Sequence, residues 1–214
     1  AILPRVLRRK AARATLLYSG AAAQATREDV TMAELDLTFE VPSIAPEVVR
    51  RAWLTWGPER LKLWPNLSSS WYEPYDVRED ERWAEVREGS EFMGAIWARE
   101  RYEWRDGGAW IKSTVLDSNV FEAGATVEVW ITPRDGDQPG TKVRMVNRRR
   151  PSKGLKGKAM GLAMRLMGRR ILNDAFVKSW KGLEANCREV LGLNPDGKPV
   201  AGASPTEVSS APSE

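Results

Sequence analysis

The sequence predicts an α+β fold in which one antiparallel sheet of about seven strands packs against a long C-terminal helix. A segment near the start alternates between apolar and polar residues, as a half-buried strand does. Six further alternating segments, separated by turn residues, fill residues 71–151. After Pro151 the apolar residues take helical spacing, and this stretch continues to Gly192.

The first strand and two short helices precede the block of strands. The apolar residues of the first strand alternate with polar ones: Leu35, Leu37, Phe39 and Val41. Pro42 ends the strand, Ser43 can cap the next helix, and Pro46 suits its first turn. That helix is expected to end at Gly57, and a second short helix is expected over residues 59–64.

Turn signals such as Asp106-Gly-Gly108 divide the middle of the chain into a meander. The strands are expected over residues 71–79, 81–88, 93–105, 109–121, 125–133 and 141–150.

The long helix is expected to begin after a cap at Ser152 and to run to about Leu191, where Gly192 and Pro195 close it. Its apolar residues form two stripes about 140° apart: Met160, Met164, Met167 and Ile171, then Phe176, Trp180, Leu183 and Cys187. Three glycines also weaken the first half: Gly157, Gly161 and Gly168. We expect a kink near Gly168, or two apolar surfaces in this half, or an ordinary core stripe with solvated basic residues.

The two ends of the chain differ in composition from the rest. Residues 1–31 are rich in Ala and Arg and lack periodic pattern, whereas Met32 runs straight into the first strand. We therefore expect 1–31 to be a disordered or non-native extension, 32–192 to be the folded domain and 193–214 to be a disordered tail.

Composition excludes several classes of chemistry. The chain has no histidine and one cysteine, Cys187, so histidine-based catalysis, thiolate zinc sites and an internal disulfide framework are excluded. We expect neither a metal nor a cofactor. A lone cysteine fits a reducing, cytoplasmic setting, and no run of 18 apolar residues exists that could span a bilayer.

Charge is divided unevenly along the chain. Residues 32–141 hold 12 basic and 21 acidic side chains, whereas residues 142–188 hold 14 basic and two acidic ones. The basic helix segment 153–170 can be a solvated face, or it can contact an anionic membrane or acidic partner. Nucleic acid is not expected, because no motif for it accompanies the charge.

The order of elements resembles the START-like helix-grip superfamily, also called SRPBCC, the polyketide cyclase/dehydrase and lipid-transport group. The likeness is carried by Trp53-Leu-Thr-Trp56, by Leu63-Trp64-Pro65, and by the segments 94–104, 110–118, 140–144 and 154–183, which resemble a bacterial subgroup. The resemblance implies a curved sheet wrapped around the final helix, with a gap between them for a hydrophobic small molecule.

Strand alternation indicates which side chains face that gap. On the strand 93–105, one face carries Ile96, Ala98, Glu100, Tyr102 and Trp104. We expect the ligand to be lined by residues from this face and from neighbouring elements: Tyr102, Trp104, Ser113, Val129, Met145, Met160, Met164 and Phe176.

Glu100 is the candidate catalytic residue or polar anchor, because this assignment puts its carboxylate beneath the helix. A buried carboxylate is costly unless it is paired. The alternatives are that Glu100 bonds to a buried Arg or Tyr, or that a bulge reverses its direction.

Three functions remain open from sequence. The leading one is binding of a lipid, polyketide or similar hydrophobic molecule. The second is a cyclase or dehydratase that uses Glu100, supported by Tyr102, although no second carboxylate clearly shares its face. The third is an interaction module at an anionic membrane surface.

Overall fold

The structure, a computed structural model, describes residues 34–91, 95–135, 140–152 and 154–201. The expectations for residues 1–31, and for the tail beyond residue 201, lie outside these ranges.

The described residues form an α+β fold with the predicted order of elements. The elements are β1 (Leu35–Val41), α1 (Pro46–Trp53), α2 (Arg60–Leu63), β2 (Glu73–Arg78), β3 (Trp83–Ser90), β4 (Ile96–Arg105), a short 3-10 turn (Asp106–Gly108), β5 (Trp110–Ser118), β6 (Thr126–Pro133), β7 (Thr141–Arg148) and α3 (Leu155–Leu191).

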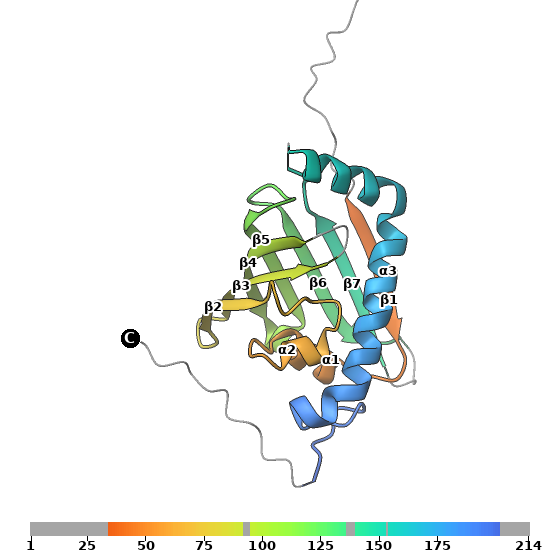
Figure 1. Ribbon diagram of the computed structural model, residues 1–214. Helices are drawn as coiled ribbons and strands as arrows, with labels where there is room; N and C mark the ends of the chain where they lie inside the picture. The colour runs from red at the N-terminus through yellow and green to blue at the C-terminus, as the bar shows by residue number, and fades with distance from the viewer. Residues whose placement is uncertain (1–33, 92–94, 136–139, 153, 202–214) are drawn as a thin grey trace, which may run out of the picture. The chain divides into compact units, whose positions relative to one another are not determined.

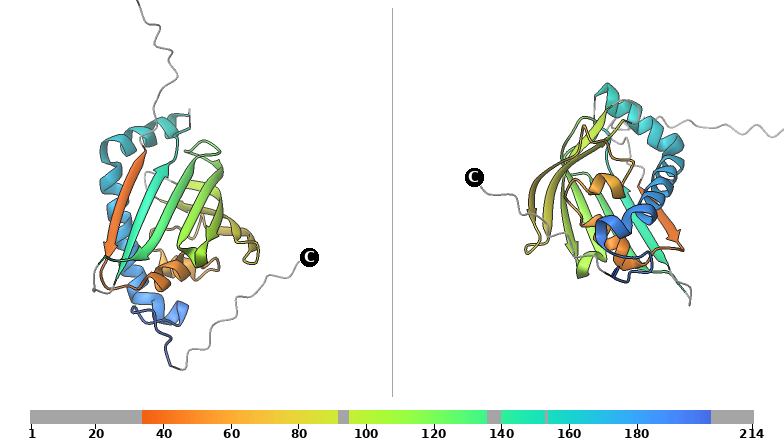
Figure 2. Two further views of the ribbon diagram at one scale, coloured as in Figure 1. Left: turned by 180° about the vertical axis from the view of Figure 1, so that it is seen from behind. Right: turned by 60° about the horizontal axis from the view of Figure 1, so that its bottom comes forward.

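The seven strands form one antiparallel sheet in the order β1-β7-β6-β5-β4-β3-β2. Strands β2 to β7 follow one another as a meander, and β1 pairs with β7 so that Leu37 lies opposite Met145. The sheet curves, and α3 lies across its inner face, while α1 and α2 fill one end (Figures 1 and 2). The predicted helix-grip architecture is confirmed.

The predicted faces of the strands are also confirmed. On β4, Ala98, Glu100, Tyr102 and Trp104 are buried, whereas Arg99 is exposed. The apolar residues of β5, β6 and β7 that were expected inside are buried: Ile111, Val115, Val127, Val129, Ile131, Val143 and Met145. A bulge does occur between Arg99 and Glu100 where β4 pairs with β5, but it leaves Glu100 facing inward.

The second half of α3 supplies the helical side of the core. Its predicted stripe is buried throughout: Phe176, Trp180, Leu183 and Cys187. The rings of Phe39 and Phe176 lie 4.1 Å apart between centroids, and those of Phe176 and Trp180 lie 5.6 Å apart. The first contact joins α3 to β1, the second lies within α3, and aromatic pairs of this kind stabilise the core beyond the area they bury.

The first half of α3 carries two apolar surfaces. Met160 is buried, but Met167 is 51% exposed, so the stripe expected there is not a continuous core face. A second row of apolar residues points outward: Leu155, Leu162 and Leu166, which are 87%, 59% and 71% exposed. This part, drawn in teal, also runs in a different direction from the blue remainder (Figure 1).

Close packing explains two of the glycines in this half. A Cβ at Gly157 would lie 2.2 Å from the Ser152 carbonyl oxygen, and one at Gly161 would lie 2.8 Å from the Pro151 ring. The predicted cap at Ser152 is wrong, because the helix begins at Leu155 and Gly154 holds the N-cap position without a side-chain hydrogen bond.

The predicted end of α3 is confirmed, whereas the predicted start of α1 is not. Gly192 adopts a left-handed conformation (φ 63°) as the C-cap of α3. At α1 the N-cap is Ala45 rather than Ser43, since Pro46 starts the helix two residues later than Ser43 would allow.

The predicted domain boundary at residue 192 is too early for the described part. Leu193 is buried and forms a bridge with Pro199, and the backbone N–H of Ala45 donates to the Pro195 carbonyl at 2.7 Å. These contacts hold residues 193–199 against the start of α1. None of the helices in the described ranges is both long and apolar enough to cross a membrane.

Candidate functional site

A pocket of about 250 Å³ lies between the inner face of the sheet and α3. One wall is apolar and comes mainly from the helices and the loop after α2: Trp53, Trp64, Leu67, Leu172 and Phe176. The opposite wall is polar and comes from the sheet and the residue that follows β7: Glu88, Ser90, Glu100, Tyr102 and Arg149. The pocket can therefore enclose an apolar body while presenting polar groups at one side.

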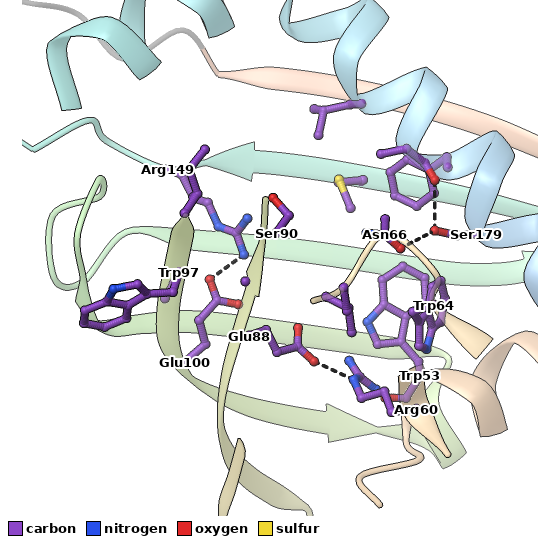
Figure 3. Close-up of a pocket in the computed structure, with 18 of the residues that line it drawn as sticks. Trp53, Arg60, Trp64, Asn66, Glu88, Ser90, Trp97, Glu100, Arg149 and Ser179 are labelled. Atoms are coloured by element: carbon purple, nitrogen blue, oxygen red, sulfur yellow. Dashed lines mark hydrogen bonds and ion pairs between the residues drawn. The ribbon is translucent and has the colours of Figure 1, made fainter. Parts of the chain in front are cut away.

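Two ion pairs, Arg60–Glu88 and Arg149–Glu100, lie along the polar wall (Figure 3), and the Tyr102 hydroxyl joins their carboxylates into one charge network. Arg60 Nε donates to Glu88 Oε1 at 2.5 Å, and the Tyr102 hydroxyl lies 2.9 Å from Glu88 Oε2. The same hydroxyl lies 3.0 Å from Glu100 Oε2, and Arg149 Nη2 donates to Glu100 Oε1. Two guanidinium groups and two carboxylates thus balance one another in charge.

Tyr102 bridges the two carboxylates. It is 6% exposed, and burial, followed by the nearby charges of Glu88 and Glu100, raises the pKa of its phenol well above the ordinary value. The phenol stays protonated and has a single hydrogen, so it can donate to only one carboxylate at a time.

Arg60 has a structural role at one end of this charge network. Its side chain is 3% exposed, and Nη1 donates to the carbonyls of Trp53 (2.8 Å) and Thr55 (3.0 Å). Its guanidinium also lies 4.6 Å from the ring centroid of Trp56. Burial is the largest single effect and acts to lower the pKa of Arg60, but Glu88, Tyr102 and Tyr72 together outweigh it, so the pKa is raised. Arg60 therefore ties α1 and α2 to the sheet.

Arg149 has fewer partners. Its Nη2 bonds to Glu100, its guanidinium lies 5.3 Å from the Phe121 ring centroid, and its buried Nε has no partner among the described residues. The side chain is 27% exposed. Burial opposes its charge, yet Glu100 raises the pKa of Arg149 above its ordinary value.

A second polar pair lies on the helical side. Ser179 Oγ of α3 and Asn66 Oδ1 are 2.9 Å apart, and Ser179 also donates to the Ala175 carbonyl at 2.9 Å. Figure 3 places this pair across the pocket from Arg149 and Glu100.

The structure brings four of the predicted site residues to the pocket: Glu100, Tyr102, Met145 and Phe176. The expected pairing of Glu100 with a buried Arg or Tyr is confirmed, since it bonds to both kinds of residue.

The other predicted residues do not line this pocket. Trp104 packs on Trp56, with ring centroids 5.9 Å apart. Ser113 and Val129 are buried on β5 and β6, opposite Tyr102 and Met145 respectively. Met160 and Met164 lie in the first half of α3, before the pocket-lining residues Leu172 and Phe176.

Sequence reasoning missed Glu88, which is the second carboxylate on the same face. Ala84, Val86 and Glu88 alternate on β3, and the burial of the first two places the third on the inner face. Strand alternation therefore contained the signal for Glu88. Arg60 and Arg149 had no such signal, because each lies outside a regular strand.

Within the described ranges, no group of three or more His, Cys, Asp and Glu side chains is placed to hold a metal ion.

The architecture and the pocket beneath α3 define the class of the fold as START-like. Comparison with solved structures supports this at low sequence identity. A START superfamily protein from Mycobacterium smegmatis matches at 15% identity with a TM-score of 0.50, covering 70% of this chain and 94% of its own.

Two further solved structures share the fold. The Zhui aromatase/cyclase from Streptomyces sp. R1128 matches at 12% identity with a TM-score of 0.53, covering 75% of this chain and 96% of its own. The protein TTHA0849 from Thermus thermophilus matches at 18% identity with a TM-score of 0.51, covering 72% of this chain and 96% of its own. No protein-family profile matches the sequence. No curated protein matches it either.

Proposed function

We propose that this protein binds a hydrophobic small molecule, such as a lipid or polyketide, in the pocket between the sheet and α3. The observation that carries the proposal is a pocket of about 250 Å³ whose helical wall is made of Trp53, Trp64, Leu172 and Phe176. Apolar surface removed from water there contributes about 25 cal/mol per Å² of buried area. Aromatic rings add preferred stacking positions for a flat ligand.

Binding of a neutral fluorescent probe, N-phenyl-1-naphthylamine, tests this proposal. We expect saturable binding to the full chain and loss of binding in Ala175→Trp, because Ala175 lines the pocket and an indole there fills it. Val177→Trp is the matched control, since Val177 lies on the same helix and is 43% exposed. Equal binding by both variants and the unsubstituted chain would contradict the proposal.

An enzyme of the cyclase or dehydratase kind is a second candidate. It is favoured by Tyr102, Glu88 and Glu100, because a phenol hydroxyl and two carboxylates within hydrogen-bond distance of it offer a proton donor and proton acceptors in one pocket. One of the structures with this fold is an aromatase/cyclase by name. Turnover of a polyketide-like chain that is lost in both Glu88→Gln and Glu100→Gln supports this candidate, whereas unchanged turnover excludes these residues.

Contact with an anionic membrane is a candidate for the first half of α3. The outward leucines Leu155, Leu162 and Leu166 are accompanied by basic side chains and by no acidic residue before Asp174. The described basic residues of this half are Lys156, Lys158, Arg165, Arg169 and Arg170; Lys153 lies outside the described residues. Such a face suits insertion at the headgroup level.

Sedimentation with vesicles tests the membrane candidate. We expect binding to vesicles containing phosphatidylserine, weaker binding at high salt, and loss of binding in the double variant Arg169→Glu/Arg170→Glu. Lys178→Glu/Lys181→Glu, on the other half of the same helix, is the control. Binding that does not depend on lipid charge or on either substitution would contradict this candidate.

A further inference from the structure

Arg60 and Arg149 lie at the two ends of the charge network in the pocket, but they differ in how many hydrogen-bond acceptors they already contact. Arg60 donates to one carboxylate and two backbone carbonyls and is 3% exposed. The guanidinium of Arg149 donates to Glu100 alone among the described residues, and the side chain is 27% exposed. A guanidinium has five N–H donors. Arg60 uses three of them and is almost fully buried, whereas Arg149 uses one and is more exposed, so Arg149 has more donors open to a ligand.

The charge balance of the polar wall limits which kind of ligand oxygen can receive a hydrogen bond from Arg149. Glu88 is already paired with Arg60, and Glu100 with Arg149. A carboxylate on the ligand would place a third negative charge beside Glu88 and Glu100, which have no further described cation to offset it. An uncharged carbonyl oxygen accepts a hydrogen bond from Arg149 without that repulsion.

The apolar wall indicates the chemical character of the rest of the ligand. Trp53 and Trp64 stand across the pocket from Arg149 (Figure 3), and the ring centroid of Phe176 lies 6.5 Å from that of Trp53. A molecule that spans the pocket therefore meets aromatic rings at one end and a guanidinium at the other.

We infer that the ligand is an uncharged molecule with an aromatic or aliphatic body and a carbonyl oxygen, and that Arg149 donates a hydrogen bond to that oxygen. This inference rests on the proposed binding function and narrows its ligand class. Arg149 is then the residue that determines specificity, while Phe176 and its neighbours supply affinity that does not depend on the oxygen.

Three probes that share one ring system test the inference: 2-acetylnaphthalene, 2-ethylnaphthalene and 2-naphthoate. Their affinities for the full chain are measured by displacement of N-phenyl-1-naphthylamine. A hydrogen bond from a charged donor predicts that the ketone binds about tenfold more tightly than the ethyl analogue. The carboxylate is expected to bind more weakly than the ketone.

Arg149→Met is expected to reduce the ketone's advantage to less than about twofold while the ethyl analogue keeps its affinity. Arg148→Met is the matched control, because Arg148 pairs with Glu34 and Glu128 and does not line the pocket. If Arg149→Met does not fold because Glu100 is left unpaired, the double variant Arg149→Met/Glu100→Gln removes both charges and is tested in its place.

The outcomes separate the two proposals. Equal affinity for all three probes, or tightest binding of the carboxylate, overturns the inference and leaves the pocket's binding function in place. Failure of the full chain to bind any probe overturns the proposed function and the inference with it. A ketone preference that survives in Arg149→Met overturns the role of Arg149.

Discussion

Glu100 illustrates how burial constrains a single residue. Its side chain is 1% exposed at the centre of β4, and both of its oxygens have partners on the inner side of the sheet. Alternation along the strand predicts this position, and the cost of burying a lone carboxylate predicts that it is paired. The identity of the partners is a property of the fold, since Arg149 is 49 residues away in sequence.

Substitution of Arg60 tests how much the buried charge network contributes to stability. Arg60→Met leaves Glu88 without its cation and removes the donors to Trp53 and Thr55, so we expect a loss of about 3–5 kcal/mol in the free energy of unfolding. Denaturant unfolding measures the loss. The double variant Arg60→Met/Glu88→Gln is expected to lose less, because no uncompensated charge remains.

An exposed ion pair gives the comparison for Arg60. Arg99 pairs with Glu85 on the outer face and is 45% exposed, so Arg99→Met is expected to cost less than about 1 kcal/mol. Equal losses of unfolding free energy in the Arg60 and Arg99 variants would show that the charge network does not hold the helices to the sheet.

The tyrosines predict how stability depends on alkaline pH. Burial raises the pKa of both Tyr72 and Tyr102 above the ordinary value of 10.0. A raised folded-state pKa gives stability that is complete below the unfolded value and is lost as pH rises above it. We therefore expect the free energy of unfolding to fall above pH of about 10.

Absorbance near 295 nm follows the phenols directly during this titration. The chain has four tyrosines, and we expect Tyr72 and Tyr102 to ionise only when the protein unfolds at high pH. Tyr102→Phe is expected to reduce the slope of stability against pH. Ionisation of all four phenols near pH 10 in the folded protein would contradict the burial of this pair.

At the scale of elements, the packing of α2 on α3 depends on a glycine. A Cβ at Gly182 would lie 2.6 Å from Cδ of Pro65 and 3.2 Å from the Leu63 carbonyl oxygen. Helix propensity alone predicts that Gly182→Ala stabilises the protein by about 1 kcal/mol. Overpacking costs about 1–3 kcal/mol, so we expect a net loss of stability.

Thermal unfolding distinguishes these two effects. Lys181→Ala, at the neighbouring exposed position, is the control and is expected to change the melting temperature little. A higher melting temperature for Gly182→Ala would mean that α2 does not pack closely against α3.

The two halves of α3 differ in how far sequence could predict them. Phe176, Trp180 and Leu183 repeat at helical spacing, and this regular stripe correctly predicted the core face. In the first half Met160 and Met167 are equally apolar, but one is buried and the other is 51% exposed. Spacing cannot decide which of two apolar faces meets the sheet, because that depends on how the helix crosses β1.

At the scale of the whole fold, the order of strands and helices was predictable, whereas the pocket was predictable only in part. Alternation fixes which strand faces point inward, so Glu100, Tyr102 and Met145 were placed correctly. It does not fix where the hollow lies along those faces. Val129 and Trp104 also point inward, but they are packed within the hydrophobic core and do not line the pocket.

The most direct test of the central claim is a crystal structure of the protein grown with 2-bromonaphthalene. We predict an anomalous bromine peak between the sheet and α3, within the pocket of about 250 Å³ beside Phe176 and Met145. Side chains of the two walls in contact with each other, and no bromine between them, would contradict the claim that this fold encloses a ligand.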